Sequence, residues 1–82
     1  MIKVRIEPLK YERIRSERID RELTQAQVAQ LLHVKQNTYS QYEIGVLNFP
    51  LEVVIKLARF YGTSVDYLVG LTDVRQPYPQ RR

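Results

Sequence analysis

Neutral polar side chains that could read nucleic acid bases gather in the middle of this sequence of 82 residues. The run contains no aspartate or glutamate, and its members are Gln36, Asn37, Thr38, Ser40 and Gln41. An amide side chain donates and accepts hydrogen bonds at once, so glutamine and asparagine can pair bidentately with N6 and N7 of adenine in the major groove. Because a polar helix face is more often simply solvated, the surrounding residues must decide between the two interpretations.

The residues around this run carry apolar side chains at a characteristic spacing. Counted from Gln25, the fourth, eighth, tenth, fifteenth and eighteenth positions are Val28, Leu32, Val34, Tyr39 and Tyr42. Ala29, at the fifth position, leaves room for a second helix to cross closely. His33 falls in the turn, where a left-handed backbone is expected. The spacing is typical of a helix-turn-helix and turns the polar residues of its second helix outward.

Five short helices are predicted from apolar periodicity and from the residues that begin and end helices. In chain order they cover about 9–22, 25–33, 36–43, 50–61 and 65–69. Thr24 with Gln27 is expected to form a capping box, and Ser64 is expected to cap the last helix. Gly45 and Gly62 are natural helix ends. The expected fold is an all-α, compact five-helix domain.

Three segments are expected along the chain. Residues 1–8 form an N-terminal extended arm, because residues 2–7 alternate apolar and polar side chains and Pro8 ends the pattern. Residues 9–71 form the helical domain. Residues 72–82 have no periodicity and are expected to be a flexible basic tail. Its arginines are expected to contact phosphate or to be solvated; they are Arg75, Arg81 and Arg82.

Composition excludes several classes of function. Cysteine is absent and His33 is the single histidine, so neither a thiol nucleophile nor a multi-histidine metal centre is possible. With no evident pair of catalytic carboxylates, we expect no enzyme activity, no metal and no cofactor. No apolar run or signal peptide is present, which predicts a cytoplasmic protein without a membrane partner. The short chain leaves no second domain for a small-molecule ligand, and its net charge of +4 mildly favours a polyanion.

Several stretches match a known family in order and spacing: Leu23 to Leu32, Thr38 to Glu43, Gly45, Ile55 to Ala58 and Ser64 to Gly70. Through them, residues from about 11 to 70 resemble the Cro and phage-repressor-like helix-turn-helix family. This is the xenobiotic-response-element type of bacterial and phage regulators. The resemblance implies a transcriptional regulator that binds double-stranded DNA as a homodimer.

The resemblance also implies roles for individual residues. The third helix would read bases with Gln36, Asn37 and Gln41, while Lys35 and Ser40 lie at the edge of the groove. The expected phosphate contacts are Gln25, Thr38 and Asn48. Arg18 would form a structural ion pair with Glu43, which agrees with the position of Arg18 on the apolar face of the first helix.

The sequence departs from the family pattern at three places. His33 stands where glycine is usual, Ile44 stands where asparagine is usual, and the loop 46–49 lacks the customary lysine and arginine. An apolar loop weakens the electrostatic attraction to DNA. Two hypotheses therefore remain: a repressor on a two-fold symmetric operator, or a protein-interaction module of the same fold, such as an antitoxin or adaptor, with secondary DNA binding.

A dimer interface is expected near the C-terminal end of the domain, as is frequent in the family. The resemblance favours Tyr67, Leu68 and Leu71. The competing position is the N-terminal arm, whose apolar residues Ile2, Val4 and Ile6 could pair across a two-fold axis.

Overall fold

A computed structural model describes residues 11–79, and within this range all regular structure is helical. The five helices are α1 (Glu12–Asp20), α2 (Gln25–Leu32), α3 (Gln36–Ile44), α4 (Leu51–Tyr61) and α5 (Val65–Leu68). The predicted all-α, five-helix fold is confirmed. Helix α1 is shorter than predicted, beginning at Glu12 and ending at Asp20. The predicted arm, the first residues of the predicted first helix, and residues 80–82 lie outside the described residues.

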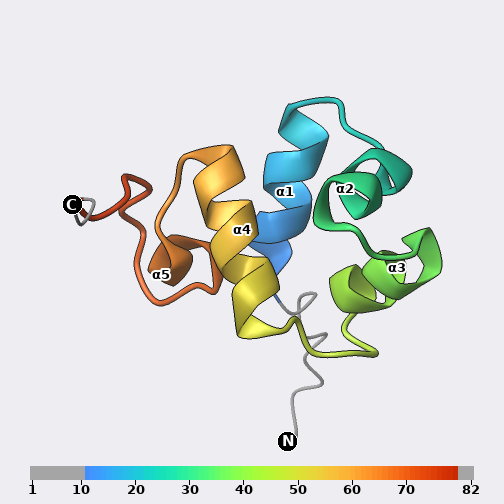
Figure 1. Cartoon of the computed structure of the whole chain (residues 1–82). Helices are drawn as coiled ribbons and strands as arrows, with labels where there is room; N and C mark the ends of the chain where they lie inside the picture. The colour runs from blue at the N-terminus through green and yellow to red at the C-terminus, as the bar shows by residue number, and fades with distance from the viewer. Residues whose placement is uncertain (1–10, 80–82) are drawn as a thin grey trace, which may run out of the picture.

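Helices α1 and α4 are drawn in the centre of the molecule in Figure 1, and α5 contacts both of them. Helices α2 and α3 lie on one side of this pair, and α5 with the C-terminal segment lies on the other. One hydrophobic core joins them, and its most deeply buried side chains are Ile14, Val28, Tyr39, Leu57 and Leu68. Because every helix contributes to this core, the short helices are held by tertiary packing rather than by their own propensity.

The helix ends use the local signals predicted from the sequence. Thr24 and Gln27 form a complete capping box. The backbone N–H of Gln27 donates to Thr24 Oγ1 at 3.0 Å, and the backbone N–H of Thr24 donates to Gln27 Oε1 at 2.8 Å. Ser64 Oγ accepts from the Tyr67 amide at 2.9 Å. Gly45 and Gly62 adopt positive φ at the ends of α3 and α4, where a side chain would strain the backbone.

The segment after α5 folds back on the domain. The Ser64 amide donates to the Arg75 carbonyl at 3.1 Å, and the Leu71 amide donates to the Asp66 carbonyl at 2.8 Å. Tyr78 Oη donates to Asp66 Oδ2 at 2.8 Å. Residues 72–79 have an irregular backbone, and the sequence does not reveal these contacts.

No helix within residues 11–79 is long and apolar enough to cross a membrane.

Candidate nucleic-acid interface

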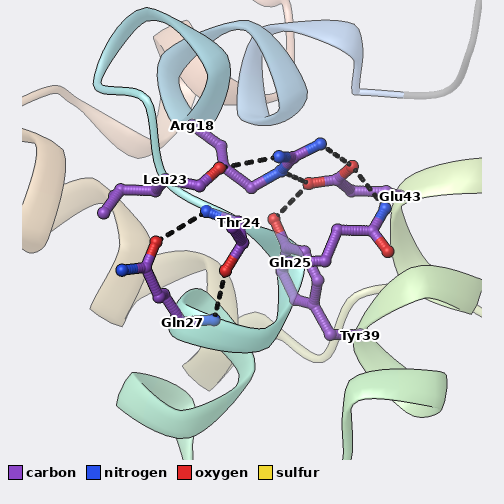
Figure 2. A network of polar contacts seen from close by, with 7 residues as sticks. All are labelled: Arg18, Leu23, Thr24, Gln25, Gln27, Tyr39 and Glu43. Carbon is purple, nitrogen blue, oxygen red and sulfur yellow. Dashed lines mark hydrogen bonds and ion pairs between the residues drawn. The ribbon is translucent and has the colours of Figure 1, made fainter.

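Glu43 connects the first three helices through its buried carboxylate (Figure 2). Arg18 of α1 approaches it with two nitrogens, Nε at 2.7 Å from Oε2 and Nη2 at 3.1 Å from Oε1. Gln25 of α2 donates from Nε2 to Oε1 at 3.2 Å, and the Tyr39 hydroxyl donates to Oε2. Arg18 Nη1 also bonds the Leu23 carbonyl at 2.8 Å, which fixes the chain entering α2.

These contacts keep a charge stable in an interior position. Burial alone would raise the pKa of Glu43, but hydrogen bonds from Arg18 and Tyr39 outweigh it and hold the pKa below its ordinary value. The same hydrogen bonding, which Arg18 donates to Glu43, raises the pKa of Arg18. Both side chains therefore remain ionised at neutral pH. The orientation of α3 is set by an ion pair that is joined by two hydrogen bonds.

The turn between α2 and α3 is closed by His33. Its φ of 59° lies in the left-handed region, as expected where the family has glycine. The His33 amide donates to Gln30 O at 3.1 Å, and the Val34 amide donates to Ala29 O at 3.0 Å. Since Ala29 is buried and presents only a methyl group, α3 can pack closely against α2 after this tight turn.

The five predicted base-contacting residues lie on α3 or at its start. Lys35, Gln36 and Asn37 are exposed, while Ser40 and Gln41 are half-buried. Within residues 11–79 no side-chain hydrogen bond engages Gln36, Asn37 or Gln41, whereas the opposite side of α3 buries Tyr39 and Glu43. The helix thus presents unengaged amides on one side and is anchored by the other.

The predicted phosphate contacts occupy different environments. Thr38 is half-buried on α3, and Asn48 is exposed in the loop that follows it. Gln25 is half-buried at the first turn of α2, and its amide nitrogen already donates to Glu43. That nitrogen carries a second hydrogen, so one donor remains for another acceptor.

The loop between α3 and α4 presents apolar side chains to solvent. Val46 is 68% exposed and Leu47 is 41% exposed. Ile44 before them and Leu51 after them are 53% and 68% exposed. Residues 44–51 carry no charged side chain, so this loop offers no cation to a phosphate.

The expected dimer residues do not share one surface. Leu71 is 77% exposed and Tyr67 is half-buried beneath the Arg13 guanidinium, whose Cζ lies 4.3 Å from the ring centroid. Leu68, in contrast, is completely buried in the core. The expectation that Leu68 contacts a second copy is therefore wrong, because α5 uses this side chain to pack against its own domain.

A second buried carboxylate, Glu17, was missed by the sequence reasoning. Its Oε1 accepts from Arg21 Nη1 at 2.6 Å and from Arg75 Nη2 at 2.7 Å, while Arg75 Nε lies 3.2 Å from Oε2. A hydrogen bond from Arg75, opposed by burial, is the main reason that the pKa of Glu17 is lowered. Glu17 follows buried Ile14 by three residues, so the helical period did place it on the inner face of α1.

Arg75 therefore differs from the sequence expectation of a phosphate-contacting or solvated tail residue. It bonds both Glu17 and the Tyr61 carbonyl, the latter at 3.1 Å.

No group of histidine, aspartate and glutamate side chains in the described part of the chain could hold a metal ion.

Comparison with known proteins identifies the same motif. A family model described as helix-turn-helix matches residues 14–68, which includes most of α1 and all of α2 to α5. The chain is 37% identical over 71 residues to YobD, an HTH-type transcriptional regulator of Bacillus subtilis, covering 87% of this chain and 63% of that protein. It is 46% identical over 58 residues to RstR, a transcriptional repressor of a cryptic CTXphi phage in Vibrio cholerae, covering 71% of this chain and 52% of the repressor. The chain thus spans between half and two thirds of these relatives.

Proposed function

The chain belongs to this helix-turn-helix family, of the Cro and phage-repressor type, and from that membership we propose that it is a sequence-specific DNA-binding transcriptional repressor. The observation that carries the proposal is the two-sided character of α3. Its inner side is fixed by Glu43 and Tyr39, while its outer side bears amides that no other described residue engages. A rigid helix with unengaged amides suits the major groove.

In this proposal Gln36, Asn37 and Gln41 read base edges, and Lys35 and Ser40 lie at the edge of the groove. Gln25, Thr38 and Asn48 bind phosphate and set the position of α3. Gln25 has a double role, because the same amide that bonds Glu43 retains a hydrogen for a phosphate oxygen.

Selection of bound sequences from random duplex DNA by the full chain tests the proposal. A single enriched palindrome is expected, since one recognition helix reads only a few base pairs and a two-fold dimer supplies the rest of the specificity. Gln36→Ala or Gln41→Ala should then weaken binding to the selected site by about 1 to 3 kcal/mol, with little change on random DNA. Gln30→Ala, an exposed glutamine of α2, is the matched control.

Equal losses on selected and random DNA would show that these glutamines do not read bases. Absence of any enrichment would favour the alternative function, a protein-interaction module such as an antitoxin or adaptor. The observation that supports this alternative is the exposed apolar loop at Val46 and Leu47, where a DNA-binding protein would gain from cations.

The proposed homodimer retains Leu71 and Tyr67 as its contact residues, without Leu68. Leu71→Lys should convert dimers to monomers in sedimentation at micromolar concentration, because it places like charges opposite one another across a two-fold axis. Ile19→Lys, at another exposed apolar position, should leave the dimer intact. If Leu71→Lys remains dimeric, this interface is wrong.

A further inference from the structure

A cavity of about 350 Å³ lies between α4 and the segment that follows α5. Its apolar lining consists of Ile55, Ala58, Val65, Pro77 and Pro79. The volume is at the lower end of the range for sites that bind small molecules. The sequence predicts no small-molecule ligand, because the chain has no room for a second domain, whereas this cavity is formed by the C-terminal segment folding back on the helices.

The cavity has a positive charge at its wall. Of the described residues that line it, Arg59 alone is charged. Within residues 11–79, no hydrogen bond or ion pair engages the Arg59 guanidinium. Asp66 does not line the cavity, and its Oδ2 already accepts from the Tyr78 hydroxyl at 2.8 Å. The lining therefore favours an anion, which gains a charge-assisted hydrogen bond from Arg59.

Thr63 adds a hydroxyl beside this cation. The residue is 3% exposed and lines the cavity, and its Oγ1 has no hydrogen-bond partner within the described residues. Rotation about the Cα–Cβ bond of threonine exchanges its hydroxyl and methyl groups, so the hydroxyl can turn toward a ligand. An acceptor that bonds it removes the cost of a buried unpaired group. A neighbouring hollow of about 260 Å³ is lined by the same Arg59 and Thr63, so the two side chains adjoin both spaces.

We propose that this cavity binds a small monocarboxylate with an aromatic or branched aliphatic body. The carboxylate pairs with the Arg59 guanidinium and accepts from Thr63 Oγ1, while the body packs against Ile55 and the prolines Pro77 and Pro79. An inorganic anion lacks the apolar body, and a neutral aromatic molecule lacks the charge. Neither therefore satisfies both parts of the lining.

The proposed ligand and DNA occupy separate surfaces. Figure 1 shows α5 and the C-terminal segment on the opposite side of the molecule from α2 and α3. A ligand between α4 and this segment leaves the outer side of α3 uncovered. The ligand site is thus independent of the proposed DNA-binding function.

Titration of the isotope-labelled full chain with sodium benzoate, followed by amide chemical shifts in NMR, tests the site. Benzoate carries both parts of the proposed ligand, benzamide replaces the charge by a neutral amide, and acetate keeps the charge without the ring. We expect saturable shifts that are largest between Ile55 and Val65 and at Tyr78, with a dissociation constant for benzoate below about 10 mM. Benzamide and acetate should each bind about tenfold more weakly or worse.

Two substitutions separate the charge from the hydroxyl. Arg59→Gln should weaken benzoate about tenfold and leave benzamide unchanged, because only a carboxylate pairs with the guanidinium. Arg15→Gln, which removes an exposed arginine of α1 away from the cavity lining, is the matched control. Thr63→Val should weaken benzoate about threefold to tenfold. Because valine has the shape of threonine without the unpaired hydroxyl, unfolding does not explain such a loss.

Four results would each overturn the proposal. The first is the absence of saturable shifts at about 10 mM benzoate, or shifts centred on other helices. Equal affinities for benzoate and benzamide would reduce the site to an apolar surface, and equal affinities for benzoate and acetate would reduce it to the charge of Arg59. If Arg15→Gln weakens benzoate as much as Arg59→Gln does, the attraction is that of a basic protein for any anion. None of these results bears on DNA binding by α3.

Discussion

The two buried carboxylates of the described residues, Glu43 and Glu17, differ in where along the chain their hydrogen-bond donors come from. Glu43 receives its donors from within the helix-turn-helix and the helix before it, namely Arg18, Gln25 and Tyr39. Glu17 receives one donor from its own helix, Arg21, and another from Arg75, 58 residues further along the chain. The first carboxylate orients α3, whereas the second holds the C-terminal segment on α1.

The arginines that pair with the two carboxylates also differ in solvent exposure. The Arg18 side chain is 12% exposed, and that of Arg75 is 45% exposed. Water can therefore replace Arg75 more easily than Arg18, and Glu17 retains Arg21 when Arg75 is lost. We infer that the site near α3 is a rigid structural element, while the contact with the C-terminal segment is the weaker of the two.

The largest expected effect is that of Arg18→Ala. It leaves the Glu43 carboxylate, 3% exposed, without its cation, and should lower the free energy of unfolding by about 3 kcal/mol or more. Urea unfolding of the full chain measures this loss, with Arg15→Ala, an exposed arginine of the same helix, as control. A loss below about 0.5 kcal/mol would mean that the pair behaves as an exposed one.

A smaller loss is expected from Arg75→Ala. It removes hydrogen bonds to Glu17 and to the Tyr61 carbonyl from a half-exposed side chain, at a cost of about 1 to 2 kcal/mol. A double-mutant cycle with Glu17→Gln isolates the ion pair. If Arg75→Ala costs as much as Arg18→Ala, the contrast between the two carboxylates is wrong.

Two buried hydroxyl groups without partners predict a gain in stability on substitution. Tyr61 Oη and Thr63 Oγ1 are buried without a hydrogen-bond partner in the described part of the chain, and burial raises the pKa of Tyr61 to about 12. Thr63→Val should stabilise the domain by up to about 1 kcal/mol in urea unfolding, because it removes an unpaired buried group at equal shape. Thr72→Val is the matched control, since Thr72 Oγ1 accepts from the Val74 amide at 3.2 Å and its loss should destabilise.

The smallest effect is expected in how the free energy of unfolding decreases at acidic pH. Both glutamates have a pKa lowered from 4.5 in the folded state, so as pH falls below that value the unfolded chain binds protons first and the folded state loses stability. The pH slope of the unfolding free energy reports how many more protons the unfolded chain binds than the folded one, and Glu17→Gln and Glu43→Gln should each lower that number by at most one. Arg75→Ala should reduce the contribution of Glu17 to the pH slope and leave the contribution of Glu43 unchanged. Urea unfolding as a function of pH measures these slopes, and an Arg75→Ala slope equal to that of the unsubstituted chain would contradict the assignment.

The fold was predictable because its signals are local. The capping box at Thr24, the left-handed His33 and the apolar spacing from Val28 to Tyr42 each depend on neighbours within one or two helical turns. The positions of the expected base-contacting residues on α3 follow from the same periodicity. Their contacts with DNA stay predictions.

The second carboxylate was not predictable for a different reason. Helical phase places Glu17 on the inner side of α1, but nothing local identifies Arg75 as its partner among the 13 lysines and arginines of the chain. The burial of Leu68 was likewise missed, because a short helix shows too little periodicity to separate its inner from its outer side.

The fastening of Arg75 fixes where the polypeptide leaves the domain. Because the Arg75 guanidinium is bonded to Glu17 and the Tyr78 hydroxyl to Asp66, any module joined after residue 79 is tethered by the residues that follow Tyr78 rather than by the whole segment after α5. A shorter tether raises the effective concentration of the joined module at nearby sites and narrows the directions it can sample. Arg75→Ala would remove the Glu17 contact and leave the bonds of the Arg75 carbonyl and of Tyr78, so it would weaken this fastening and loosen the geometry of a fusion protein.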